Sequence, residues 1–359
     1  MKKSKALILC LSAVLAVSML AGCGSSGSSS SSSTKKSSSK SSTEEGTLFT
    51  EYKAKMEKLL DPLPEKNKTK SIGLIVSPTS NSYWATLVEG AKDCAKDYGV
   101  NLDVTQTQSD TDFSGQLDIL NTMVSKNEEA VAFSPQSGTN LIQGIVNANK
   151  NNVKTVLNGT ALDEDALKQA GGHIDGATVV DCYHQGEVNA AFVAKKNKNK
   201  GKVAIIGGSE GATQSDDRVS GAKDTYKKKG MEVVAVQNCD FDAQKAYETV
   251  KNIATAHPDL VGITCCNDDM ALGAVRALKE LDLNDQVVVC GVDFTDAAKE
   301  SIKNGELDGT IAQSPYLNGY ACILMTLKVA QGQDVGNMGD IVPATVVSKS
   351  NLSKMKGWK

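Results

Sequence analysis

From residue 70 onward, short apolar runs rich in β-branched residues alternate with longer stretches whose apolar side chains recur at helical spacing. The short runs predict strands at residues 71–76, 102–105, 130–133, 153–157, 202–206, 231–236, 260–265 and 287–291. The longer stretches predict helices at residues 83–98, 113–126, 138–149, 213–229, 243–256, 270–281 and 295–304. Strands that alternate with helices in this way predict parallel sheets with helices on both faces.

This pattern restarts at Lys202, so the chain contains two similar halves, each about the size of a typical domain. Its 359 residues exceed what one ordinary core requires, in agreement with two doubly wound domains. Residues 177–181 form a strand-like run into the second half, and residues 310–313 lead out of it. A helix at residues 315–331 and an extended segment at residues 341–347 follow. A chain that returns in this way crosses between its halves more than once, which is typical of hinged domains.

The first residues carry a targeting signal. Lys2, Lys3 and Lys5 precede an apolar segment at residues 6–20, which is the order of a secretory signal peptide. The Leu-Ala-Gly-Cys sequence that ends at Cys23 resembles a bacterial lipobox, which implies cleavage before Cys23 and lipidation of its thiol. We therefore assign residues 1–22 to a lipoprotein signal peptide; secretion with an incidental cysteine is the alternative.

A Ser-rich segment follows the signal. Residues 24–42 are almost wholly serine and cannot bury apolar surface, so we expect residues 23–45 to be a disordered tether. A random coil of this length reaches roughly a few tens of Å, which suits a domain held off a membrane surface. Residues 46–60 have apolar side chains at helical spacing and end before Pro62 and Pro64. We expect residues 46–69 to form an amphipathic helix and a linker.

Composition argues against several functions. The formal net charge is −3, so nothing suggests a nucleic-acid partner. Beyond Cys10 and Cys23, an odd number of cysteines lies on mostly apolar segments without zinc-site spacing, which predicts free buried thiols and no metal. They are Cys94, Cys182, Cys239, Cys265, Cys266, Cys290 and Cys322. No catalytic triad or phosphate-binding loop is evident, so we expect neither a cofactor nor an enzyme.

Polar side chains follow the predicted strands. After the strand at residues 260–265, Asn267 opens a helix, and small ligands bind at such strand ends in open parallel sheets. The Asn267 amide both donates and accepts hydrogen bonds, although helix capping alone would explain it. Tyr83 and Trp84 follow the polar turn after the first strand. An aromatic ring there can pack on the C–H face of a sugar, although a place in the helix core is the alternative.

Several segments together resemble the ribose-type, or type I periplasmic, sugar-binding proteins, a family that also includes the effector domain of lactose-repressor-like regulators. They read SPTSNSYW at 77–84, GATQSDDRVSG at 211–221, CDFD at 239–242, LVGITCCNDDMALGA at 260–274, CGVD at 290–293 and TIAQSP at 310–315. The resemblance covers roughly residues 70–347. It implies two doubly wound parallel-sheet lobes joined by hinge strands, at residues 70–180 with 314–342 and at residues 181–313 with 343–359.

The resemblance also implies which side chains contact the ligand. These are Ser77, Asn81, Tyr83, Trp84, Arg218, Phe241, Asn267, Asp293 and Gln313. A guanidinium such as that of Arg218 can donate to two neighbouring hydroxyls, and a carboxylate such as that of Asp293 accepts from them.

One segment departs from the family pattern. Ribose-type members end the fourth strand with an Asp-Arg pair that holds sugar hydroxyls, and Gly159 and Thr160 occupy those positions here. Asn158 or Thr160 can make neutral hydrogen bonds instead. A buried hydroxyl left unpaired costs about 1–3 kcal/mol, so we expect a ligand other than ribose itself. Asp181 and Tyr183, beside the first crossover, are candidates for extra contacts.

The resemblance implies an extracellular, lipid-anchored solute-binding protein on the bacterial cell membrane. We expect it to be a monomer that captures a small carbohydrate or polyol between its lobes and delivers it to an ABC transporter permease. One alternative is a ligand sensor that presents its closed form to a membrane receptor or kinase. A repressor-type effector domain is disfavoured by the signal and the lack of a helix-turn-helix, and an α/β hydrolase is the least favoured.

Overall fold

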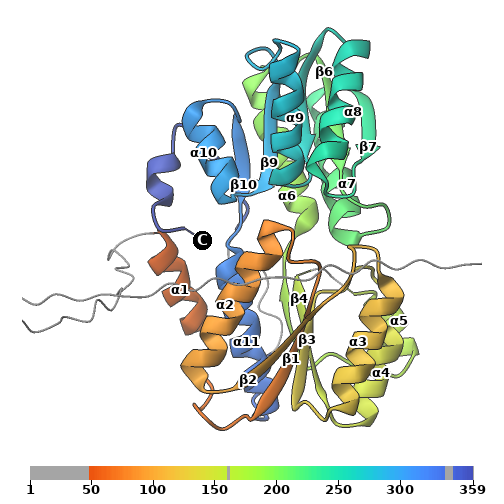
Figure 1. Cartoon of the computed structure of the whole chain (residues 1–359), viewed down its shortest axis with the longest axis vertical. Coiled ribbons are helices and arrows are strands. Elements are labelled where there is room, and N and C mark those ends of the chain that lie inside the picture. The colour runs from red at the N-terminus through yellow and green to blue at the C-terminus, as the bar shows by residue number, and fades with distance from the viewer. Residues whose placement is uncertain (1–47, 160–161, 336–342, 359) are drawn as a thin grey trace, which may run out of the picture. The chain divides into compact units, whose positions relative to one another are not determined.

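The computed structural model describes residues 48–159, 162–335 and 343–358. The predicted signal peptide, Cys23, the tether and Thr160 lie outside these residues. In the described part, strands and helices alternate as the apolar pattern predicts, with bounds that differ by a few residues (Figure 1). Among the described helices, none combines the length and the apolar character that a membrane crossing requires.

The first lobe is built on a five-stranded parallel sheet of order β2-β1-β3-β4-β5. Its strands are β1 (Ser71–Val76), β2 (Asn101–Gln106), β3 (Ala130–Phe133), β4 (Lys154–Gly159) and β5 (Gly176–Val179). Its helices are α2 (Ser82–Tyr98), α3 (Phe113–Ser125), α4 (Ile142–Lys150), α5 (Glu164–Gln169) and α11 (Pro315–Ala330). Successive β1 residues enter opposite cores, with Leu74 packed on the α2 and α11 side and Ile75 on the α3 and α4 side.

The second lobe is built on a six-stranded sheet of order β11-β10-β9-β8-β6-β7, in which only β11 is antiparallel. Its strands are β6 (Lys202–Gly207), β7 (Glu232–Asn238), β8 (Leu260–Cys265), β9 (Val288–Asp293), β10 (Gly309–Ala312) and β11 (Thr345–Ser348). Its helices are α6 (Cys182–Lys196), α7 (Thr213–Lys229), α8 (Ala243–Ala256), α9 (Asp268–Glu280) and α10 (Asp296–Asn304).

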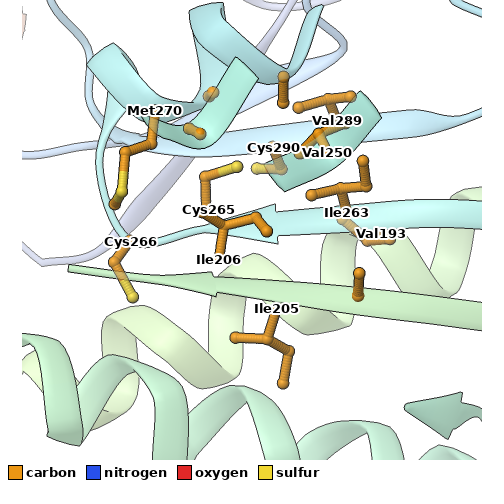
Figure 2. Close-up of a cluster of buried hydrophobic side chains, with 14 of the residues drawn as sticks. Val193, Ile205, Ile206, Val250, Ile263, Cys265, Cys266, Met270, Val289 and Cys290 are labelled. Atoms are coloured by element: carbon orange, nitrogen blue, oxygen red, sulfur yellow. The ribbon is translucent and has the colours of Figure 1, made fainter. Parts of the chain in front are cut away.

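Four cysteines lie in the core of this lobe and two in the core of the first lobe. The seven described cysteines are all free and buried, as predicted. Figure 2 shows Cys265 and Cys290 turned toward each other among branched aliphatic side chains, with Cys266 on the other side of β8. Burial raises the pKa of the Cys265 and Cys290 thiols well above the ordinary value, so both behave as small apolar groups.

The chain passes between the lobes three times, which agrees with the prediction of more than one crossover. The passages lie between β5 and α6, between β10 and α11, and between α11 and β11. The last of these lies partly outside the described residues. In each sheet the strand order changes direction beside one strand, at β1 in the first lobe and at β6 in the second. Ligands of open α/β sheets bind at such a switch point, beside the carboxyl ends of the strands.

The sequence did not predict α6, and its packing gives the reason. The first half of the helix buries Gln185, Gly186 and Asn189 against α7 and the sheet, and its second half adds only the small apolar side chains of Ala190, Val193 and Ala194. A Cβ on Gly186 would lie 2.1 Å from the carbonyl oxygen of Arg218, so close helix contact requires glycine. Asn189 Nδ2 donates to the carbonyl oxygens of Cys265, Cys290 and Gly291. The apolar periodicity of this packed helix is therefore weak, because polar residues and glycine fill much of its inner face.

A short helix near the start of the described chain, α1 (Leu48–Leu59), packs on the first lobe. The Tyr52 ring meets the Trp358 ring edge-on at 5.5 Å, which places the C-terminal residues beside α1 (Figure 1). Lys328 of α11 donates to the carbonyl oxygens of Leu60 and Pro62, both at 2.6 Å. The predicted amphipathic helix is thus held by side-chain and backbone contacts.

Candidate functional site

The carboxyl ends of strands from both sheets meet around one pocket. The space between its lining atoms, part of which is open to solvent, is about 520 Å³. Its lining residues follow β1 to β5 in the first lobe and β6 to β10 in the second. They are Asn81, Tyr83, Trp84, Asp110, Ser134, Asn158, Gly159, Val180, Cys182, Gln214, Arg218, Phe241, Asn267, Asp293 and Gln313.

Aromatic rings line the pocket from both lobes. Tyr83 and Trp84 lie in the first turn of α2, with their rings perpendicular and 5.1 Å apart. Asn81 caps this helix by accepting from the Tyr83 N–H at 2.9 Å, which leaves its amide N–H groups available. In the second lobe, Phe241 has a left-handed φ of 57°. A Cβ on Gly208 would lie 2.1 Å from the Phe241 ring, so only glycine allows this ring position.

Arg218 and Asp293 are linked through two buried glutamines. Arg218 Nε donates to Gln185 Oε1 at 2.9 Å, and Gln185 Nε2 donates to Gln313 Oε1 at 3.1 Å. Gln313 Nε2 in turn donates to Asp293 Oδ1 at 2.7 Å. Arg218 Nη1 donates to the Cys266 carbonyl at 2.9 Å, so Nη2 is the guanidinium nitrogen outside these bonds. We call this chain of four side chains the Arg–Gln–Gln–Asp network.

Asp293 ends β9 with a φ of 124° and is 6% exposed. Burial raises the pKa of its carboxyl to about 7, against the opposing influence of the Arg218 charge and the Gln313 hydrogen bond. Asp268 supports the following turn, because it accepts from Thr310 Oγ1 at 2.6 Å and from the Thr295 N–H at 2.8 Å. Burial and the charge of Asp293 raise the pKa of the Asp268 carboxyl as well. The turn that presents Asp293 is therefore fixed by a second buried carboxyl.

A family model described as a periplasmic binding protein domain matches residues 72–334. The chain belongs to this family, within its ribose-type, type I sugar-binding branch. It is 32% identical to the D-allose-binding periplasmic protein of Escherichia coli K12 over 67% of this chain and 78% of the relative. It is 30% identical to a ribose import binding protein of Bacillus subtilis 168 over 70% of this chain and 79% of that relative.

Solved structures agree with this assignment. A periplasmic solute-binding protein of Actinobacillus succinogenes with bound D-allose is 27% identical, with a TM-score of 0.74, over 79% of this chain and 99% of that one. A carbohydrate-transporter solute-binding protein of Agrobacterium radiobacter in complex with D-arabinose is 29% identical, with a TM-score of 0.73, over 81% of this chain and 97% of that one. The two-lobed α/β fold of this periplasmic binding protein therefore matches what the sequence predicted.

In this periplasmic binding protein, most of the side chains predicted to contact a ligand line the one pocket. Asn267 lines it and also caps α9, because its Oδ1 accepts from the Met270 N–H at 2.9 Å while its amide N–H groups stay available. Asn158 lines it as well, but Thr178 donates to its Oδ1 at 2.8 Å and its Nδ2 donates to Ser134 at 3.1 Å. The Asn158 amide thus has one N–H that remains available to a ligand.

Three predicted residues lie elsewhere. Ser77 is buried outside the pocket lining, and its hydroxyl lowers the pKa of the Asp110 carboxyl. Tyr183 donates to Asp224 at 2.8 Å on the exposed side of α6, and Asp181 caps α6 by accepting from the His184 N–H. For Asp181 and Tyr183 the prediction of extra pocket contacts is wrong, because α6 begins at Cys182 and turns these side chains outward.

The pocket also contains side chains that the sequence analysis missed. Asp110 and Ser134 follow β2 and β3, Gln214 opens α7, and Val180 and Cys182 flank the first crossover. These residues share only a position close to the end of a predicted strand or the start of a predicted helix. Because every βα turn has residues at such positions, this position alone does not identify pocket residues. Among the described residues, no three His, Cys, Asp or Glu side chains are grouped as a metal site requires.

Proposed function

We propose that the protein captures a small sugar or polyol between its two lobes and performs no chemistry on it. The observation that carries this proposal is the Arg–Gln–Gln–Asp network in a pocket lined by aromatic rings from both lobes. Nη2 of Arg218 and the Asp293 carboxylate offer a donor and an acceptor to neighbouring hydroxyls, and the rings offer apolar faces to the C–H side of the ligand. A ligand that contacts both lobes stabilises their closed arrangement through its differential affinity.

The relatives narrow the ligand class. Two are named for D-allose and ribose, and a solved neighbour above 25% identity contains D-arabinose. Gly159 has no side chain to offer a ligand, and an added Cβ there would meet no atom within 4 Å. We therefore propose a monosaccharide or cyclic polyol other than ribose, whose shape or substituents suit the uncharged end of β4.

Calorimetric titration of the purified protein tests this function. D-ribose, D-allose, D-arabinose and myo-inositol are titrated, with a panel of amino acids and nucleosides for comparison. We expect saturable binding of a sugar or polyol, and a ligand at a hundred times its Kd should add about 2.7 kcal/mol to the free energy of unfolding. Binding confined to amino acids or nucleosides, or conversion of a bound sugar into a product, would contradict the proposal.

We further propose that Cys23 carries a lipid that anchors the protein outside the cell membrane, with residues 23–45 as the tether. The signal-like first residues and the Leu-Ala-Gly-Cys sequence support this location. The test is membrane fractionation of cells that express the wild type or Cys23→Ala. The wild type should sediment with the membrane fraction, and the variant, which lacks the lipid, should be lost from that fraction.

Delivery to an ABC permease is the proposed next step, with the protein as a monomer whose lobes comprise residues 70–180 with 314–342 and residues 181–313 with 343–359. The relatives named as import and solute-binding proteins support this partner. A sensor that presents the same closed form to a membrane receptor or kinase is the second candidate. Uptake of the labelled ligand separates them, because deletion of the gene should abolish uptake only if the protein serves a permease.

A further inference from the structure

Asp110 is a second carboxylate in the pocket, and it comes from the opposite lobe to Asp293. It lies in the turn between β2 and α3 and lines the pocket. Among the lining residues contributed by the first lobe, it is the one that has a carboxyl group. The two carboxylates therefore reach the pocket from two lobes, one after β2 and the other after β9.

The turn that carries Asp110 is well fixed. Asp112 accepts from the Gln108 N–H at 3.2 Å and from the Gly115 N–H at 3.1 Å, which closes the turn onto α3. The Ser109 carbonyl accepts from Thr107 Oγ1 at 2.9 Å and from Gln136 Nε2 at 2.7 Å. Asp110 lies between these anchored residues, so its position is set by the fold.

One oxygen of Asp110 has no partner among the described residues. Oδ1 is buried and accepts no hydrogen bond from the described residues, and the effect of the nearby Ser77 hydroxyl is to lower the pKa of the carboxyl. Buried acceptors are almost always paired, because an unpaired one carries the full loss of its hydration. An unpaired carboxylate oxygen at the wall of a ligand pocket indicates that the missing donor belongs to the ligand.

The surrounding charges do not supply that donor. Burial raises the pKa of the Asp110 carboxyl, and the negative charge of Asp240 in the second lobe raises it further. Lys245 is engaged by Asp240 at 2.6 Å, and Arg218 is engaged by Gln185 and Cys266. Among the ion pairs of the described residues, none includes Asp110.

We propose that Asp110 is a ligand-binding residue that determines specificity: its Oδ1 accepts a hydrogen bond from a ligand hydroxyl. This inference rests on the proposed function, and it names a feature of the ligand. The ligand carries one hydroxyl toward the turn after β2 and another toward Asp293. By joining carboxylates of two lobes, such a ligand favours the closed arrangement. Asp110 thus provides the first lobe with the charged acceptor that the end of β4 lacks.

The test compares the wild type with Asp110→Ala and Asp110→Asn by calorimetric titration at pH 8. The probe is whichever of D-ribose, D-allose, D-arabinose and myo-inositol binds the wild type most tightly. We expect Asp110→Ala to weaken binding at least tenfold and Asp110→Asn to weaken it by a smaller factor. Asp118→Asn is the matched control, since Asp118 is an exposed residue of α3 in the same lobe and lies outside the pocket lining, and its Kd should stay within about threefold.

Analogues of the same ligand, each lacking one hydroxyl, make the test specific to Oδ1. One analogue should bind the wild type at least tenfold more weakly than the parent, yet bind Asp110→Ala about as well as the parent does. Such non-additivity identifies a direct contact. Unchanged affinity in Asp110→Asn with an unchanged melting temperature would overturn the inference while the proposed function stands. If the wild type binds none of the sugars or polyols, the proposed function fails and the inference fails with it.

Discussion

Replacing Asp293 with asparagine should stabilise the free protein and weaken ligand binding, because burial of the carboxylate costs stability while its charge serves the proposed ligand site. Folding raises the pKa of Asp293 from 3.8 to about 7, chiefly through loss of hydration. At about 1.36 kcal/mol for each pH unit, the ionised carboxylate lowers the free energy of unfolding by roughly 4 kcal/mol at pH 8. This destabilisation is absent below the unfolded pKa, grows as the pH rises between the two pKa values and is complete above the folded one.

Asp293→Asn removes the charge and keeps an oxygen that can accept from Gln313. The variant should equal the wild type near pH 4 and should exceed it above pH 7. Part of the gain is offset because the variant amide also needs partners, so we expect about 2–4 kcal/mol at pH 8. At about 2–4 °C for each kcal/mol, the melting temperature of the free protein should rise by several degrees.

Ligand binding should change in the other direction. Hydrogen bonds to charged groups contribute about 1.5–3 kcal/mol, so the variant should bind the ligand roughly 10 to 150 times more weakly at pH 8. The two proteins should converge as the pH falls from 8 to 5, because the wild-type carboxyl becomes protonated. Calorimetric titration at each pH measures this ratio, and thermal unfolding without ligand measures stability.

The exposed Asp285 provides the control, because Asp285→Asn removes the same charge from the surface of the same lobe. It should show neither the pH-dependent gain in stability nor the loss of binding. A stability gain of Asp293→Asn that is equal at pH 4 and pH 8 would refute the assignment to a buried charge. Unchanged binding would refute the place of Asp293 in the ligand site.

Three further predictions concern other parts of the site. Arg218→Ala should abolish detectable sugar binding. Arg218→Lys should lower affinity at least tenfold, because an ammonium group cannot donate to two hydroxyls as the planar guanidinium does. Retained affinity in calorimetric titrations of variants with an unchanged circular dichroism spectrum would contradict this. Gly208→Ala should displace the Phe241 ring, from which its Cβ would lie 2.1 Å away, and weaken binding in titrations, whereas Gly332→Ala, with no neighbour within 4 Å, should not. Trp358→Ala should lower the free energy of unfolding by about 3 kcal/mol in denaturant titrations.

The alternation of apolar runs was sufficient to predict the two sheets, because parallel strands buried on both faces form continuous β-branched runs. It failed for α6, whose inner face includes Gln185, Gly186 and Asn189 beside small apolar residues. A helix packed partly through glycine and amide side chains has only a weak apolar period to detect. The same helix supplies Gln185, so the sequence also missed the link between Arg218 and Gln313.

The candidate site was predictable to the extent that a family pattern marked it. Arg218, Asn267 and Asp293 follow recognisable segments, whereas Asp110 lies in a turn with several polar residues of similar appearance. What distinguishes Asp110 is an unpaired oxygen at a pocket wall, and that property depends on residues far apart in the chain. Pairing of this kind is a tertiary property that local sequence does not encode.

Gln313 joins ligand binding to the connection between the lobes. Its side chain donates to Asp293, while its backbone carbonyl, at the second crossover, accepts from the Trp358 indole at 3.1 Å. Trp358 in turn packs on Tyr52 of α1, and both α1 and Trp358 lie outside the segment that the family model matches. A change in the charge of Asp293 therefore acts on a residue whose backbone is held by the first and last described elements. The helix that follows the Ser-rich segment is thus linked, through Trp358, to the second crossover between the lobes.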